Sequence, residues 1–78
     1  MKKVTIYSTP SCTYCKMTKE FLHQNNVPFE EIDVSSNEER RNEMVEKSGQ
    51  MGVPVIDIEG AIIVGFDEPR LRETLEIK

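Results

Sequence analysis

The sequence lacks the features that mark several common classes of protein. No apolar run approaches about 18 residues, the length that a membrane-spanning helix needs. Basic residues are not in excess: 10 Lys and Arg stand against 14 Asp and Glu, and the net charge is −4. A general nucleic-acid binder is therefore excluded, because it needs a basic surface to neutralise phosphates. The charged start Met1-Lys2-Lys3 has no apolar signal-peptide stretch behind it, so we expect a cytosolic protein.

The chain is also short, and it has no tryptophan and few aromatic residues. Its 78 residues allow one domain, which we expect to span residues 1–78. A chain of this size buries only about 60% of the surface that it exposes when unfolded. We therefore expect a thin core and a functional site that is a shallow surface groove.

The hydrophobic pattern predicts seven elements in the order β-α-β-α-β-β-α. Strands are predicted at residues 4–7 and 27–34, a hairpin at 53–58 and 61–64, and helices at about 13–25, 37–48 and 67–77. The buried face of the first helix is predicted to hold Tyr14, Met17, Thr18, Phe21 and Leu22. This order predicts an α/β fold with a small mixed sheet and helices on both of its faces.

Polar residues with capping chemistry precede the last two helices. Ser35 with Glu38, and Ser36 with Glu39, form two overlapping capping boxes before the second helix. Asp67 can cap the start of the third.

The two cysteines, Cys12 and Cys15, have the spacing C-x-x-C. A ring this small would add only about 2 kcal/mol to stability, so the pair is a poor structural staple. In a cytosolic protein such a pair is redox-active, metal-binding or incidental, and redox chemistry is the interpretation that we favour. Tetrahedral zinc needs four ligands. The chain adds only His23, about two turns away, so a metal site would need a second chain or an outside thiol.

The two thiols have different expected environments. Cys12 precedes the first helix, where free N–H groups and the positive end of the helix dipole stabilise a thiolate. The thiolate is the reactive form of cysteine. Cys15 falls at the edge of the predicted buried face. We therefore expect Cys12 to be exposed and to act as the nucleophile, and Cys15 to be the resolving thiol.

The sequence resembles the glutaredoxin family of the thioredoxin-fold superfamily. The resemblance is carried by a strand that runs into Cys12-Thr13-Tyr14-Cys15, by Val53-Pro54, and by Gly65-Phe66-Asp67 before the last helix. It implies a thioredoxin-like fold and a cis Val53–Pro54 bond beside the cysteines, against the alternative of a trans proline that opens a strand. It also implies that substrate or glutathione is bound by Tyr14, Val53, Pro54, Gly65, Phe66 and Asp67.

Two of these residues are also suited to purely structural roles. Tyr14 matches the aromatic residue of the family's C-P-Y-C pattern, but its helical spacing also suits a core residue. Asp67 matches an acidic position that can hold the glutathione amino group, and it is equally suited to a helix cap.

Three departures from the family pattern weaken the expectation of tight glutathione binding. Thr9 stands where typical users of glutathione carry lysine or arginine, and Gly52 replaces the threonine of T-V-P. Phe66 replaces the second glycine of a G-G pair, and Gly65-Phe66 is instead similar to a segment of the NrdH-redoxin branch.

The sequence thus predicts a thiol–disulfide oxidoreductase that acts on protein or glutathione-mixed disulfides. No organic cofactor is expected, because the cysteine pair carries the two electrons, although glutathione is a possible co-substrate. The electron donor is glutathione or, in an NrdH-like carrier, thioredoxin reductase. We expect a monomer; a dimer joined through Cys12, or an iron–sulfur or zinc-binding dimer, is the alternative.

Overall fold

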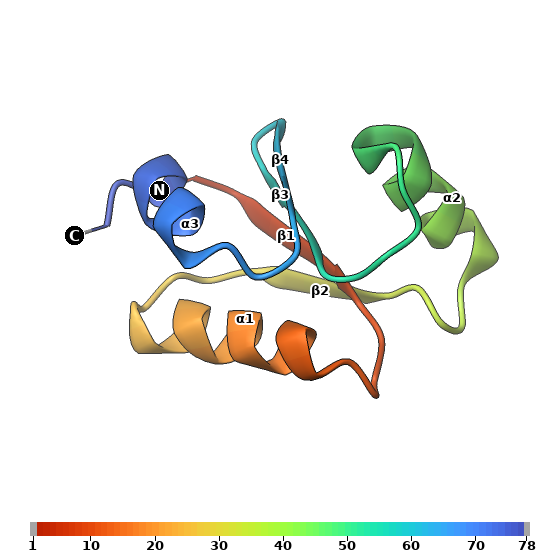
Figure 1. Ribbon diagram of the computed structural model, residues 1–78, viewed down its shortest axis with the longest axis horizontal. Helices are drawn as coiled ribbons and strands as arrows, with labels where there is room; N and C mark the ends of the chain where they lie inside the picture. The colour runs from red at the N-terminus through yellow and green to blue at the C-terminus, as the bar shows by residue number, and fades with distance from the viewer. Residues whose placement is uncertain (1, 78) are drawn as a thin grey trace.

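A computed structural model describes residues 2–77 and contains the seven elements in the predicted order (Figure 1). They are β1 (Val4–Ser8), α1 (Thr13–Gln24), β2 (Glu30–Asp33), α2 (Glu38–Ser48), β3 (Val55–Ile58), β4 (Ala61–Val64) and α3 (Glu68–Leu75). The second strand is shorter than the predicted 27–34, and α3 ends before the predicted residue 77. These differences lie at the ends of elements, where local patterns carry the least information.

The four strands form one mixed sheet in the order β2-β1-β3-β4. β1 is central and runs parallel to β2, with Tyr7 opposite Ile32. β1 is antiparallel to β3, with Thr5 opposite Asp57, and β3 continues into β4 as a hairpin. The parallel pair requires a crossover, and α1 supplies it.

Helices cover both faces of this sheet, as predicted. Figure 1 shows α1 and α2 on opposite sides of the strands. The first face packs Val4, Ile6, Ile56, Ile58 and Ile63 against Phe21 and Leu22 of α1 and Leu71 of α3. The second face packs Tyr7, Ile32, Val34 and Val55 against Met44 of α2. The alternation of Ile6 and Tyr7 along β1 assigns neighbouring residues to opposite faces.

The inner face of α1 is narrower than predicted. Cys15, Thr18, Phe21 and Leu22 are buried. Tyr14 and Met17 are not: 62% of Tyr14 and 42% of Met17 is exposed. Assigning these two residues to the core is therefore wrong, because the sheet and α3 cover only the central part of the predicted stripe.

The start of α2 also differs from its predicted capping. Its N-cap is Asn37, whose side-chain oxygen accepts a hydrogen bond from the backbone N–H of Arg40 at 3.0 Å. Ser35 instead donates its hydroxyl to Asp33 at 2.6 Å. Neither predicted serine cap is therefore the N-cap of this helix.

A buried tyrosine joins α2 to the sheet. The Tyr7 hydroxyl donates a hydrogen bond to Glu43 and accepts one from Lys47 at 3.0 Å. Lys47 also pairs with Asp57 of β3 at 2.8 Å. Burial is the main cause that raises the pKa of Tyr7, so this residue stays a neutral hydrogen-bond donor.

The hairpin turn follows from its glycine. Glu59 has φ +50° and Gly60 has φ +98°, as a two-residue type I′ turn requires. Within residues 2–77, no helix is both long enough and apolar enough to span a bilayer.

Candidate active site

Cys12 is the N-cap residue of α1, with an extended backbone at φ −88° and ψ 114°. Its sulfur accepts a hydrogen bond from the backbone N–H of Cys15 at 3.1 Å. The thiol thus takes the place that a serine or aspartate side chain usually holds at a helix start. It is half-buried, whereas the sequence predicted an exposed thiol, and it is free. An N–H donor and the helix dipole both favour negative charge on this sulfur.

Cys15 has the opposite environment. Its side chain is fully buried, and its thiol is free. Burial is the largest cause that raises the pKa of Cys15 to about 12, and the hydrogen bond with Cys12 acts in the same direction. Lys19 lies one turn further along α1 and opposes the shift, but more weakly. At neutral pH Cys15 is therefore a protonated thiol.

The Val53–Pro54 bond is cis, as the family resemblance implied. The segment lies beside the cysteines: the carbonyl oxygen of Val53 is 3.9 Å from the sulfur of Cys12. In the described part of the chain the Val53 N–H has no hydrogen-bond partner. Pro54 is buried, and its carbonyl accepts from the N–H of Gly65 at 2.8 Å. That bond ties the cis-proline loop to the end of β4.

The segment from Gly65 to Asp67 leads from that bond into α3. Gly65 has φ +79°, a conformation that favours glycine, and a Cβ placed there would meet no atom within 4 Å. The space beside Gly65 is therefore open. Asp67 caps α3, since its side chain accepts from the N–H of Arg70 at 3.2 Å. The structural role expected for Asp67 is thus present.

Phe66 packs inward from this segment. It is half-buried, and its ring meets that of Phe21 edge-on, with centroids 6.0 Å apart at an interplanar angle of 65°. Tyr14, two residues after Cys12, is exposed to solvent. It is therefore free to contact a substrate.

Two neighbours of the site gave no signal in the sequence. Gln50 folds its side-chain amide onto the backbone of Gly52, and Met51 between them is 70% exposed. The contact depends on the torsions of a long side chain, which no local pattern encodes.

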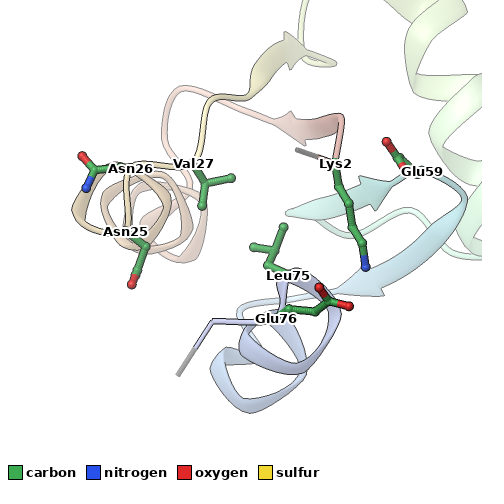
Figure 2. A pocket seen from close by; sticks show the side chains of 7 residues that line it. All are labelled: Lys2, Asn25, Asn26, Val27, Glu59, Leu75 and Glu76. Atoms are coloured by element: carbon green, nitrogen blue, oxygen red, sulfur yellow. The ribbon is translucent and has the colours of Figure 1, made fainter.

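A separate cavity lies away from the cysteines. It has a volume of about 460 Å³ and lies at the carboxyl ends of α1 and α3. Figure 2 shows the side chains that line it: Lys2, Asn25, Asn26, Val27, Glu59, Leu75 and Glu76. Cys12 lies at the other end of α1, about 18 Å away for a helix of 12 residues. The cavity is therefore not part of the cysteine site.

Comparison with known proteins decides the family. The family model described as Glutaredoxin matches residues 4–63. The chain belongs to the glutaredoxin family. A glutaredoxin-like 8.6 kDa protein of the rubredoxin operon of Clostridium pasteurianum is 45% identical over 73 residues, which are 94% of this chain and 97% of that protein.

Solved structures agree with this assignment. A variant of the thioredoxin-like protein BC3987 has a TM-score of 0.91 at 36% identity, with both chains fully covered. The glutaredoxin-like NrdH-redoxin from Escherichia coli has a TM-score of 0.81 at 25% identity, covering 91% of this chain and 92% of its own. This glutaredoxin is therefore a redox protein of thioredoxin-like fold with a C-x-x-C cysteine pair.

A metal site is not assembled by the described residues of this glutaredoxin. Within residues 2–77, no cluster holds three or more His, Cys, Asp or Glu side chains arranged to bind a metal ion. A zinc or iron–sulfur site would thus need ligands other than these residues.

Proposed function

We propose that this glutaredoxin reduces disulfides of other proteins, with Cys12 as the attacking thiol and Cys15 as the resolving thiol. The observation that carries the proposal is the difference between the two sulfurs. Cys12 is partly exposed and accepts an N–H at a helix start, whereas Cys15 is fully buried with its pKa raised to about 12. Of the two thiols, only Cys12 is accessible to a substrate disulfide.

In the first step the Cys12 thiolate attacks one sulfur of the substrate disulfide. A bond forms between that sulfur and Cys12, the substrate S–S bond breaks, and the second substrate sulfur leaves as a thiolate that takes a proton from solvent. The N–H of Cys15, at 3.1 Å, stabilises the attacking charge before the step.

In the second step Cys15 gives up its proton to solvent or to the departing thiolate, and its sulfur attacks Cys12. The Cys12–Cys15 bond forms, the mixed disulfide breaks, and the remaining substrate sulfur leaves reduced. Two electrons and two protons pass from the cysteine pair to the substrate. No organic cofactor is needed for this exchange.

Substrate alignment would use the cis-proline segment. The unpaired Val53 N–H and the Val53 carbonyl, 3.9 Å from the sulfur, can pair with a substrate backbone as an added strand. Tyr14 lies two residues after Cys12, and the Gly65–Asp67 segment begins with the N–H that bonds the Pro54 carbonyl. We assign them contact with the groups next to the substrate disulfide, and Asp67 would add a carboxylate for a substrate amino group.

Thioredoxin reductase is the second candidate for the electron donor, and Phe66 favours it. A phenylalanine ring packed on Phe21 occupies the position of the family's second glycine. Thr9 supplies no cation for a glutathione carboxylate. The solved NrdH-redoxin is described as having a thioredoxin-like activity profile. Glutathione remains the donor that the wider family suggests.

Serine variants test the cysteine roles. Cys12→Ser is expected to abolish exchange with every disulfide. Cys15→Ser is expected to accumulate a mixed disulfide, because the resolving sulfur is gone, and intact-protein mass spectrometry detects it. A dead Cys15→Ser protein together with an active Cys12→Ser protein would reverse the assignment.

A coupled assay separates the donors. The oxidised protein is offered either glutathione with glutathione reductase, or thioredoxin reductase, and NADPH consumption is followed in both. Reduction in the thioredoxin reductase system alone supports the NrdH-like function, and reduction by glutathione alone rejects it.

A further inference from the structure

Gln50 and Gly52 form a local clamp directly before the cis-proline. The Gln50 side-chain nitrogen donates to the Gly52 carbonyl at 3.0 Å, and the Gly52 N–H donates to the Gln50 side-chain oxygen at 2.7 Å. The Gln50 side-chain amide thus pairs with both the N–H and the carbonyl of Gly52, as the backbone of a neighbouring strand would. Ser48 adds a hydrogen bond to the Gln50 carbonyl at 2.9 Å.

The clamp depends on the absence of a side chain at residue 52. A Cβ at this position would lie 2.8 Å from the side-chain oxygen of Gln50, so any larger residue displaces the amide. The φ of Gly52 lies outside the left-handed region, unlike that of Gly49, Gly60 and Gly65. The backbone itself would therefore accept an ordinary residue, and the glycine is needed only while the Gln50 amide stays folded over it.

The clamp lies next to the reacting atoms. Gly52 is bonded to Val53, whose carbonyl is 3.9 Å from the Cys12 sulfur. Residues 51 and 52 lie outside any helix or strand, and the chain bends at Val53. With both backbone groups of Gly52 held by the Gln50 amide, the segment that leads into this bend is restrained beside the Cys12 sulfur.

Met51 is held within the same clamp. It is 70% exposed, so burial among the described residues does not account for an apolar side chain there. A flexible thioether side chain is well suited to contact varied apolar groups of a partner. Its place two residues before Val53 puts it along the path that a bound polypeptide would follow.

We propose that the Gln50–Gly52 clamp is a specificity element that pre-organises residues 51–53 to receive a disulfide carried on an extended segment of another polypeptide. Met51 contacts an apolar side chain of that segment. A small disulfide has no backbone or side chains to reach this region, so the clamp raises selectivity for protein disulfides. The proposal rests on the proposed function, because it assumes that Cys12 attacks the bound disulfide.

The test measures single turnovers of pre-reduced protein with two probes. Insulin supplies a protein disulfide, and bis(2-hydroxyethyl) disulfide supplies a small one. Quenched samples are analysed by mass spectrometry. Because the protein is reduced beforehand and turns over once, the reaction needs no electron donor. Gln50→Ala removes both clamp bonds, and Gly52→Ala displaces the amide without straining the backbone. Gln24→Ala is the matched control, because it removes the same type of side chain from the exposed side of α1.

Each clamp variant is expected to raise the half-saturating insulin concentration about fivefold, which corresponds to about 1 kcal/mol, and to leave the limiting rate unchanged. The double variant should be no worse than either single one, because both remove the same contact. Rates with the small disulfide should not change, and Gln24→Ala should match the parent protein with both probes.

Met51→Ala keeps both clamp bonds and is expected to raise the half-saturating insulin concentration by a similar factor. An unchanged value would refute the contact assigned to Met51. Equal losses with both probes, or no loss with insulin in the clamp variants, would overturn the clamp proposal. Failure of the parent protein to reduce either probe would instead refute the proposed function.

Discussion

Titration of Cys15 should make the reduced protein lose stability above pH 9. Burial, aided by the hydrogen bond with Cys12, raises the pKa of Cys15 from 9.0 to about 12 on folding. The unfolded chain therefore releases this proton at a lower pH than the folded chain does. The contribution of Cys15 to stability is complete below pH 9 and is lost as the pH rises from 9.0 toward 12.

The size of the effect follows from the unfolded value. One pH unit above it, at about pH 10, the free energy of unfolding should be lower by about 1.4 kcal/mol than at neutral pH. Any folded pKa above about 11 gives nearly the same loss at this pH, because the folded thiol then stays protonated.

Urea denaturation followed by circular dichroism, with a non-thiol reductant present, measures this loss. Cys15→Ser is the matched variant, because it keeps Cys12 and the buried Tyr7, whose pKa is also raised. The Cys12–Cys15 disulfide form is the second control, since it has no thiol to titrate. An equal decline in the reduced parent and in Cys15→Ser would refute the buried-thiol reasoning.

Three further predictions concern single sites. In urea titrations, Asp67→Ala should lower the free energy of unfolding by about 1 kcal/mol, because the cap of α3 is lost. Asp67→Asn should keep most of the parent protein's stability, because an asparagine side chain can also cap the helix. Met44→Ala removes a fully buried side chain and should cost about 2–5 kcal/mol in thermal unfolding, against less than about 0.5 for the exposed Met51→Ala. At neutral pH iodoacetamide should label Cys12 well before Cys15, and equal labelling by peptide mass mapping would contradict their assigned environments.

The order of elements could be predicted because local periodicity encodes it. The glycine turn after Glu59 and the cap at Asp67 also depend on residues close in sequence, and both are present. The features that were predicted wrongly depend on neighbours that are distant in the sequence or that compete for the same hydrogen bonds. A helical wheel gives the direction of Tyr14 but not how far α3 and the sheet extend over it. Capping of α2 passes to Asn37 because Asp33 already holds Ser35.

The candidate site was predicted by two different routes. The C-x-x-C spacing and the helix start gave Cys12 and Cys15 different environments on physical grounds, and the structure has that difference. The cis form of Val53–Pro54 came only from the family resemblance, since an X–Pro bond in a folded protein is cis in about 5% of cases. The amide of Gln50 was not foreseen, because it depends on where a flexible side chain comes to rest.

The central position of β1 has a consequence for synthesis of the chain. β1 pairs with β3, so that Thr5 lies opposite Asp57, and most of the chain must be made before this pairing can form. Cys12 and Cys15 leave the ribosome well before Val53 and the hairpin that follows it. Until that hairpin docks, β1 lacks its antiparallel partner and the core of the sheet is incomplete, so the folded environments of the two thiols are not yet complete. The difference between the two thiols is therefore a property of the complete sheet and not of the cysteine segment alone.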